Sequence, residues 1–334
     1  MVSYRATRIY GDGIGPEVVG AAVRVVKAVG VDIDWEDAEG GAETFARTGE
    51  ALPAATIESI QRNGVGLKGP TATPSSGGFR SVNVELRQKL DLYANFRPAK
   101  SIPNTVQRFD DVDLLVIREN TEGLYSGLEH EVVPGVVESL RIITDRASRR
   151  VVRFAFDSAR RLGRKKVTAV HKANILKLSD GLFLKVAREV ADEYSDIEYD
   201  ECIVDACAMK LVVDPSQFDV LVMENLFGDI VSDLCSGLVG GLGLTASGNI
   251  GQERAVFEAV HGTAPDIAGK GVANPTALIR SAALMLEHLG EADAGQRIET
   301  AIRQVIAEGK HVTGDLGGNA NTQEFTDAVI AHLG

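Results

Sequence analysis

The 334-residue sequence has no apolar run of about 18 residues, so it predicts no membrane-spanning helix. Its N-terminus lacks a basic segment followed by a long apolar stretch, and we therefore expect no secretory signal and a cytoplasmic location. Basic residues are too few to balance the acidic ones, 35 against 47, and the net charge of −12 argues against nucleic acid as a partner. Cysteines are scarce and form no CxxC pair, which predicts reduced thiols at Cys202, Cys207 and Cys235.

Short β-branched runs alternate with amphipathic segments along the chain. A strand is expected over residues 7–15, ending in a glycine-rich turn, and a helix with Pro16 at an early position follows over 16–30. Four later runs have the same strand character, at residues 111–120, 165–172, 197–205 and 218–225. This alternation predicts an α/β protein with a mostly parallel sheet covered by helices.

Three glycine-containing segments depart from that alternation. Residues 129–144 carry a Pro-Gly pair at their middle and predict a β-hairpin, which we expect to grip a second subunit. Residues 238–251 interleave glycines with apolar residues, so we expect a crossing between domains rather than a disordered linker. The opening GDGIG lacks the third glycine of a dinucleotide-binding fingerprint, and a structural turn better explains its glycines, Gly11, Gly13 and Gly15.

Three arginines stand at positions suited to binding an anion. Arg87 and Arg97 bracket a helix-to-strand passage, and Arg118 ends the apolar run DLLVI. An arginine at the end of a strand in an α/β sheet points toward the crevice where ligands usually bind, and its planar fork binds carboxylates bidentately. Together the arginines predict a site for a polyanionic substrate, whereas a surface salt bridge better explains any one of them alone.

Three aspartates in the sequence are candidate ligands of a metal ion. Asp229 and Asp233 are four residues apart, which places both carboxylates on one face of a helix near its start, and Asp205 closes a predicted strand. Oxygen ligands without an accompanying Cys–His cluster favour Mg²⁺ or Mn²⁺ over zinc. Helix capping is the alternative explanation for each aspartate taken alone.

Two residues are candidates for proton transfer. Tyr125 lies in a polar turn directly after Arg118, and Lys172 follows an apolar strand that would hold its amine near the edge of the sheet. A lysine among carboxylates and a metal can act as an acid or base, with a pKa set by those neighbours. We interpret the adjacent His171 as a packing or hydrogen-bonding residue.

Residues 260–275, VHGTAPDIAGKGVANP, combine glycines with Asp266 in a segment that has no strand pattern. Backbone N–H groups in such loops can cradle a pyrophosphate. The carboxylate of Asp266 can accept both hydroxyls of an adenosine ribose, and it would repel a 2′-phosphate. The segment therefore predicts a site for NAD.

Taken together, these segments resemble the β-decarboxylating dehydrogenases, a family acting on isocitrate, 3-isopropylmalate, homoisocitrate, and tartrate or malate. LDLYANFRP, RENTEGLYSG, VHKANI, NLFGDIVSDL and HGTAPDIAGKGVANP follow the family's order and spacing, and the likeness is greatest to its NAD-dependent isocitrate dehydrogenases.

The resemblance implies a two-domain fold with a large mixed sheet that is not a Rossmann fold. Residues 1–92 with 240–334 would form the large, cofactor-side domain, and 93–239 the small domain, with a dimer-forming arm at about 126–145. It also implies a homodimer, or a higher oligomer, with shared active sites.

The resemblance implies a role for each candidate residue. Tyr125 would protonate the enolate carbon after loss of CO₂, and Lys172 of the second subunit would assist removal of the hydroxyl proton. The substrate carboxylates would be held by Arg87, Arg97 and Arg118. The ligands of Mg²⁺ or Mn²⁺ would be Asp229, Asp233 and, across the interface, Asp205. NAD would be surrounded by Thr73, His261, Gly262, Thr263, Ala264, Asp266, Ile267, Asn274 and, from the second subunit, Asn174.

Two further contrasts with the family favour isocitrate and NAD. Isopropylmalate enzymes place apolar residues on the helix that faces the variable group of the substrate, whereas this chain has Ser81, Val82 and Asn83 there. A hydroxyl and an amide suit the γ-carboxylate of isocitrate. Asp266 and Ile267 replace the lysine and tyrosine of NADP-dependent relatives. The alternatives are a homoisocitrate dehydrogenase or dual-substrate enzyme and, more remotely, a noncatalytic regulatory subunit, which the presence of all the catalytic residues disfavours.

Overall fold

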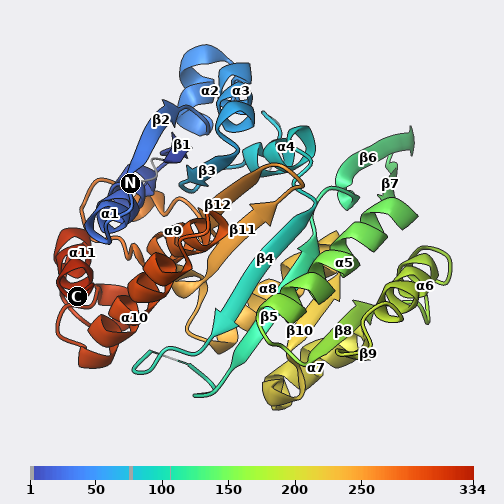
Figure 1. Cartoon of the computed structure of the whole chain (residues 1–334). Coiled ribbons are helices and arrows are strands. Elements are labelled where there is room, and N and C mark those ends of the chain that lie inside the picture. Colours follow the sequence, from blue (N-terminus) through green and yellow to red (C-terminus); the bar gives the residue numbers. More distant parts are fainter. Residues whose placement is uncertain (1–3, 75–77, 106) are drawn as a thin grey trace.

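The computed structural model describes residues 4–74, 78–105 and 107–334, and in these ranges ten strands form one mixed sheet (Figure 1). In their order across the sheet, the strands are β2 (Ile33–Ala38), β1 (Tyr4–Ile9), β3 (Val65–Lys68), β12 (Ala255–Ala259), β11 (Ala246–Ile250), β4 (Ala94–Lys100), β5 (Asp113–Glu119), β10 (Val220–Met223), β8 (Lys166–His171) and β9 (Glu198–Ile203). Neighbouring strands are parallel except where β11 pairs with β12 and β4, and where β4 pairs with β5. The expected α/β class and mixed sheet are confirmed.

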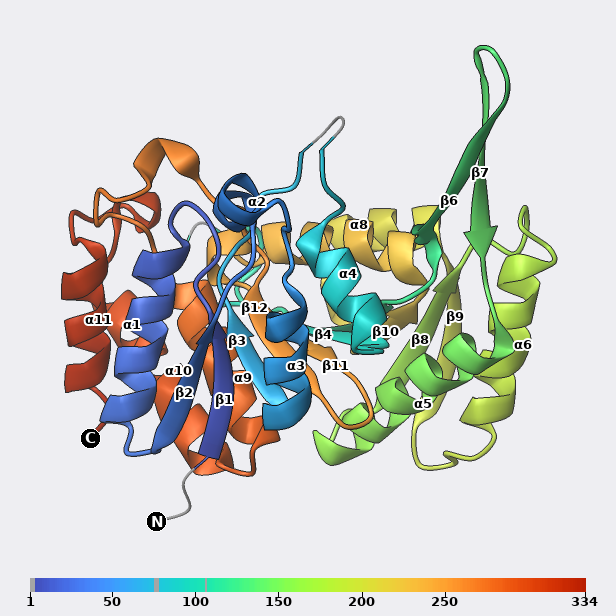
Figure 2. The ribbon, with the colours of Figure 1, turned by 90° about the horizontal axis from the view of Figure 1, so that it is seen from above.

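Helices cover both faces of this sheet (Figures 1 and 2). The α-helices of the described residues are α1 (Gly15–Ala28), α2 (Ala42–Thr48), α3 (Ala54–Asn63), α4 (Val82–Lys89), α5 (Asp145–Arg161), α6 (Ser179–Ala191), α7 (Val204–Val213), α8 (Asn225–Leu238), α9 (Thr276–His288), α10 (Ala292–Glu308) and α11 (Thr322–Ala331). None of them is long and apolar enough to cross a bilayer.

Alternating side chains of each strand enter cores on opposite faces of the sheet. In β5, Leu115 and Ile117 pack with residues of α5 and α6, whereas Leu114 and Val116 pack with residues of α7 and α8. In the other half of the sheet, one face packs with α1, α9, α10 and α11, and the opposite face packs with α3 and α4. The sheet is therefore buried on both sides, as parallel strands require.

The predicted β-hairpin is present and projects away from the body of the molecule (Figure 2). It consists of β6 (Gly123–Val133) and β7 (Val136–Ile142), joined at Gly135, whose φ of +82° suits glycine. Large apolar side chains along it are exposed, among them Val133, Val136 and Val137. Tyr125 lies within β6 rather than in a separate turn.

Two expectations need correction. Residues 238–251 do more than cross the molecule, because they contribute β11 to the centre of the sheet, next to β12 and β4. Asp205 does not close a strand but lies in the first turn of α7. The proposed division into two domains stays a prediction, although each half of the sheet has its own cores.

The three cysteines are free and buried, as expected for reduced thiols. Cys202, Cys207 and Cys235 all lie in the core between the sheet and helices α7 and α8.

Candidate active site

A row of paired residues crosses the middle of the sheet and points to one face. Val256 of β12 pairs with Asn249 of β11, Asn249 pairs with Asn95 of β4, and Asn95 pairs with Arg118 of β5. Paired residues on neighbouring strands share a face of the sheet. Three of these four side chains are polar and buried, so a polar site lies on the face that α4 and α8 flank.

Arg118 is the most deeply buried charge of this site, with 1% of its surface exposed. Its Nε and Nη2 donate to Asn225 Oδ1 at 2.9 and 2.7 Å, and its Nη1 forms an ion pair with Asp229. Helix α8 comes this close because residue 228 is glycine, since a Cβ there would lie 2.4 Å from the Arg118 Cγ. The guanidinium also lies over the Tyr125 ring, 4.9 Å from its centroid.

Arg97 and Arg87 complete a cluster of three buried arginines. Arg97 donates to Ser232 Oγ at 2.6 Å and to Asp233 Oδ1 at 3.0 Å. Burial and, next, the positive charge of Arg87 lower the pKa of both Arg97 and Arg118, that of Arg118 to about 10. Because the three cations repel one another, the cluster is suited to a ligand with several negative charges.

The carboxylates of α8 and the hydroxyl of Tyr125 face these arginines. The Tyr125 hydroxyl donates to Asp229 Oδ2, and both burial and this hydrogen bond raise the pKa of Tyr125, which keeps its proton at neutral pH. Burial alone would raise the pKa of Asp229, but Arg118 and the Tyr125 hydroxyl outweigh burial and lower it. Burial raises the pKa of Asp233 despite Arg97 nearby. The site therefore holds a protonated phenol next to an ionised carboxylate.

The donor set on α8 fits a hard divalent cation. Asp229 and Asp233 lie one helical turn apart and remain partly exposed, and Mg²⁺ is usually bound by one or two carboxylates together with water and substrate oxygens. Among the described residues, no group of three His, Cys, Asp or Glu side chains is arranged to hold a metal. One chain thus supplies two carboxylates of the predicted metal site but not a third.

Lys172 and Asp205 form an ion pair with each other, at the ends of β8 and β9. Among the described contacts, neither side chain reaches the arginine cluster or Tyr125. The neighbouring His171 is buried, and its Nδ1 accepts the Ala173 N–H at 3.0 Å, as expected for a hydrogen-bonding residue. The predicted proton-transfer pair of Tyr125 and Lys172 is therefore not assembled within one chain.

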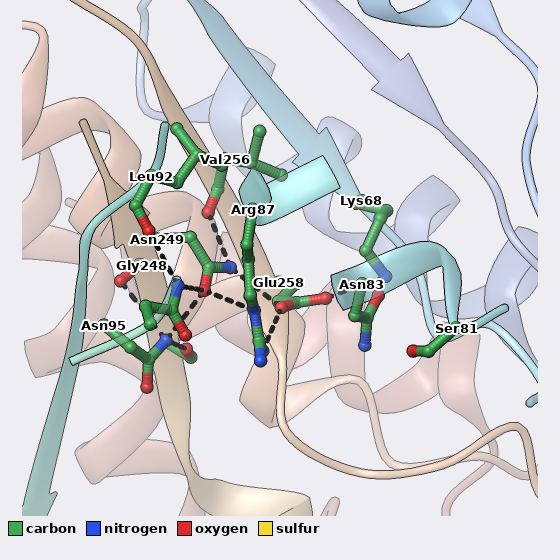
Figure 3. Close-up of polar contacts among 12 residues, drawn as sticks. Lys68, Ser81, Asn83, Arg87, Leu92, Asn95, Gly248, Asn249, Val256 and Glu258 are labelled. Carbon is green, nitrogen blue, oxygen red and sulfur yellow. Dashed lines mark hydrogen bonds and ion pairs between the residues drawn. The ribbon is translucent and has the colours of Figure 1, made fainter. Parts of the chain in front are cut away.

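Ser81 precedes α4, and Asn83 and Arg87 lie within it, with Arg87 next to the buried Glu258 (Figure 3). Thr71 Oγ1 donates to Asn83 Oδ1 at 3.3 Å, and the Thr73 and Ser81 hydroxyls are 3.4 Å apart. The loop at residues 69–74 therefore contacts both residues that were predicted to select the substrate.

A buried polar network behind Arg87 was not foreseen (Figure 3). Glu258 pairs with Lys68 at 2.8 Å and Arg87 at 3.3 Å, and it accepts Asn249 Nδ2 at 2.8 Å. Asn249 Oδ1 in turn accepts Arg87 Nε at 3.1 Å and Asn95 Nδ2 at 3.0 Å. Lys68 and Glu258 are single charges within short, otherwise uncharged strands, and this was the only signal in the sequence.

A separate cavity of about 720 Å³ lies between the loop at 260–275 and residues 314–320. Of the predicted cofactor residues, those that line it are His261, Gly262, Ala264, Ile267 and Asn274. Those that do not are Thr73, Asn174, Thr263 and Asp266. The other wall of the cavity includes residues of the glycine-rich run GDLGGNA at 314–320, from which no individual cofactor residue was predicted.

This cavity fits a dinucleotide in chemistry as well as in size. The buried His261 Nε2 has no hydrogen-bond partner within the described part of the chain, and burial lowers the pKa of the imidazole, which is neutral at pH 7. An unpartnered ring nitrogen in a largely apolar cavity is suited to a polar group of a ligand.

Comparison with known proteins gives similarity along almost the whole chain. The sequence is 56% identical over 329 residues to the Arabidopsis thaliana mitochondrial protein named isocitrate dehydrogenase [NAD] catalytic subunit 5, covering 98% of this chain and 88% of that one. It is also 56% identical over 307 residues to a chloroplastic 3-isopropylmalate dehydrogenase of Solanum tuberosum, covering 92% and 86%. The crystal structure of isocitrate dehydrogenase from Methylococcus capsulatus superposes with a TM-score of 0.96 at 54% identity, covering 99% of both chains.

The expectation of a cytoplasmic location is wrong by this comparison. Relatives from plants, insects and mammals that are named NAD isocitrate dehydrogenases are described as mitochondrial. The composition of the first residues was therefore no guide to location.

The sequence motifs, the mixed sheet and the buried arginine cluster agree with these similarities. Residues 5–329 match the isocitrate/isopropylmalate dehydrogenase family. The chain therefore belongs to the isocitrate/isopropylmalate dehydrogenase family.

Proposed function

We propose that this protein catalyses the NAD⁺-dependent oxidative decarboxylation of isocitrate to 2-oxoglutarate and CO₂. The observation that carries the proposal is the convergence of Arg87, Arg97 and Arg118 in one buried site, because isocitrate has three carboxylates. The names of relatives at 50–56% identity support the same reaction and the same cofactor.

Different residues of the chain bind the substrate, the metal and the transferred proton. The three arginines bind and orient the carboxylates, since a planar guanidinium pairs with a carboxylate through two parallel hydrogen bonds. Asp229 and Asp233 would hold Mg²⁺ or Mn²⁺, and the metal would supply Lewis-acid polarisation of a substrate oxygen. Tyr125, whose raised pKa keeps it protonated, donates its proton to the carbon that loses CO₂.

The cofactor would bind in the 720 Å³ cavity between the loop at 260–275 and residues 314–320. His261 and Asn274, which line the cavity, would contact NAD. Thr73 would lie on the nicotinamide side and Asp266 on the adenosine side, outside the cavity lining. NAD⁺ supplies the hydride acceptor, and the cavity's residues orient it and exclude water.

Each active site includes residues of a second copy of the chain. Lys172 and Asp205 lie apart from Tyr125 within one subunit, and the exposed apolar hairpin offers a surface for a partner. We assign the protein a homodimeric unit in which the partner provides Lys172 for removal of the hydroxyl proton, Asp205 for the metal, and Asn174 for the nicotinamide. Heteromeric assembly is the alternative, since related chains are named catalytic, alpha or regulatory subunits.

The identity of the substrate distinguishes this proposal from its rivals. The 3-isopropylmalate dehydrogenase is as similar in sequence as the isocitrate enzymes, so identity alone does not select between them. Ser81 and Asn83 accept hydrogen bonds from Thr73 and Thr71, which leaves their O–H and N–H groups to donate to a ligand. They favour isocitrate, because an isopropyl group would offer these donors no acceptor. A homoisocitrate or dual-substrate enzyme is the second candidate.

Initial rates of NADH formation test the proposal, with Mg²⁺, NAD⁺ and isocitrate, homoisocitrate or 3-isopropylmalate in parallel. We expect kcat/KM to be highest for isocitrate. Ser81→Leu combined with Asn83→Leu should lower the preference for isocitrate over 3-isopropylmalate by at least about tenfold. Lys89→Gln, a change on the exposed side of α4, is the matched control. Higher activity of the wild type on either other acid would contradict the proposal.

A further inference from the structure

The turn at residues 11–17, which runs from the end of β1 into the first residues of α1, touches both loops that form the proposed ligand sites. The Asp12 N–H donates to the Pro70 carbonyl at 2.8 Å, in the loop at 69–74. The Ile14 N–H donates to the Thr263 carbonyl at 3.0 Å, in the loop at 260–275. The turn therefore bridges two segments that are almost 200 residues apart in the sequence.

Glycine is required at the two contacts. A Cβ at Gly11 would lie 2.1 Å from the Pro70 oxygen, and one at Gly13 would lie 2.2 Å from the Thr263 oxygen. Both glycines also have positive φ angles, of 73° and 61°. The glycines of the GDGIG motif thus allow the backbone of the turn to contact the backbone of both loops. This is the structural role that the sequence predicted for them.

Asp12 fixes the first of these loops with its side chain. The carboxylate is buried, and it accepts hydrogen bonds from the backbone N–H groups of Ala42 at 2.9 Å, Glu43 at 3.0 Å and Ala72 at 2.8 Å. Ala72 lies between Thr71 and Thr73, which contact Asn83 and Ser81. The position of the substrate-selecting residues is therefore linked to Asp12.

Glu17 fixes the second loop in the same way. Its carboxylate accepts the backbone N–H groups of Ala273 at 2.7 Å and Gly271 at 3.2 Å, and it also accepts the Thr322 hydroxyl. Ala273 and the adjacent Asn274 line the proposed NAD cavity. Glu17, at the other end of the turn from Asp12, therefore holds one wall of that cavity in place.

We propose that the turn at 11–17 sets the relative position of the substrate and cofactor loops, with Asp12 and Glu17 as positioning residues for separate ligands. Asp12 acts through the loop at 69–74 on isocitrate, and Glu17 acts through the loop at 271–274 on NAD. The assignment of ligands rests on the proposed function. Because the two carboxylates contact different loops, their substitutions have different kinetic effects, which a common role in folding would not produce.

The test compares Asp12→Asn and Glu17→Gln in the purified full chain. Each amide turns a carboxylate oxygen into a donor that faces a backbone N–H. We expect Asp12→Asn to raise the KM for isocitrate at least about tenfold and, since Thr73 is the one residue of this loop assigned to NAD, to raise the Kd for NAD⁺ by less than about threefold. Glu17→Gln should raise the Kd for NAD⁺ at least about tenfold and leave the KM for isocitrate within about twofold. The Kd is measured by isothermal titration calorimetry with NAD⁺ alone, and thermal unfolding midpoints are recorded for all variants.

Matched controls are Glu43→Gln, an exposed acid on α2, and Asp327→Asn, an exposed acid on α11 that pairs with Arg24. Both should leave the KM and the Kd unchanged. If Glu17→Gln does not fold, Thr322→Val removes the hydroxyl that contacts both Glu17 and the Ala273 carbonyl. It should raise the Kd for NAD⁺ about threefold, with recovery in Thr322→Ser.

Lower unfolding midpoints with unchanged KM and Kd in both variants would overturn the proposal, and so would equal effects of both variants on both ligands. A wild-type protein that binds NAD⁺ but does not oxidise isocitrate would instead refute the proposed function. In that case an unchanged Kd for NAD⁺ in Glu17→Gln would still refute the positioning role.

Discussion

Individual charges in the centre of the sheet are kept ionised by their partners rather than by water. Glu258 is the clearest case, because it is buried between Lys68, Arg87 and Asn249. Burial alone would raise its pKa, but the positive charges of Lys68 and Arg87 lower it from 4.5 to about 2. Arg87 is thereby held in place before any substrate arrives, which reduces the cost of ordering it on binding.

Glu258 should make the stability of the protein depend on acidity. A carboxylate whose pKa is lower in the folded state stabilises it above the unfolded pKa of about 4.5, and this contribution is lost as the pH falls toward 2. We expect Glu258→Gln to reduce the free energy of unfolding by ~3 kcal/mol at pH 7. The difference from wild type should narrow below pH 4.5.

Urea unfolding followed by the fluorescence of Trp35, the single tryptophan, measures this difference at each pH. Glu43→Gln serves as the control and should follow the wild type throughout. A deficit in Glu258→Gln that stays constant between pH 7 and pH 3 would contradict the assignment of the stabilisation to an ionised carboxylate.

Side chains at strand and helix ends were the ones that sequence reasoning could find. Arg118 after DLLVI and the aspartates of α8 were recognisable because ligand sites gather where elements end. Asn249 and Glu258 were missed, because each is a single polar residue within a short strand, and its partners lie on other strands. Their importance appears only once the register of the sheet is known.

Among the elements that the structure describes, the β6–β7 hairpin exposes the most large apolar side chains to solvent in a single chain. Val137 is 64% exposed and Val133 is 54% exposed, although isolated hairpins gain little stability from their own contacts. A second copy of the chain would bury these side chains, in keeping with the proposed dimer.

A single charge in this hairpin should therefore prevent association. We expect Val137→Asp to convert the dimer into monomers, because a buried and unpaired carboxylate costs several kcal/mol at an interface. Analytical ultracentrifugation at micromolar concentration measures the change. Glu138→Gln, on the neighbouring residue of β7, is the control and should remain dimeric. A monomeric wild type, or a Val137→Asp protein that still dimerises, would contradict the role of the hairpin.

The sequence predicted β5, β8 and β10 because each is an apolar run followed by a polar end. The segment that forms β11, ASGNI, has no such pattern, and its glycine and polar residues suggested a connection instead. Its place in the sheet depends on pairing with β4, about 150 residues earlier in the chain, and no local pattern contains that information.

For the whole molecule, the separation of Tyr125 from the Lys172–Asp205 pair leads us to expect that activity requires the proposed dimer. In a homodimer with shared sites, a Tyr125→Phe subunit and a Lys172→Met subunit together form one site with both substitutions and one with neither. Mixing the two inactive proteins should therefore restore activity.

After reversible dissociation and equal mixing, about half of the dimers are hybrids with one intact site, so we expect about one quarter of the wild-type rate. NADH formation from isocitrate measures it. Each variant mixed with itself is the control and should stay inactive. Absence of any recovery, in samples shown to contain hybrid dimers, would place both residues in a site made by one chain.

The buried thiols of Cys202, Cys207 and Cys235 make the folded protein unreactive toward cysteine reagents. Burial raises the pKa of Cys235 to about 12 and raises those of the other two, so almost no thiolate is present at neutral pH. A cysteine introduced on the hairpin would accept a fluorescent label without background from the natural residues. All three cysteines lie in the core beneath α7 and α8. The rate at which a reagent labels them would therefore measure how often that core opens transiently.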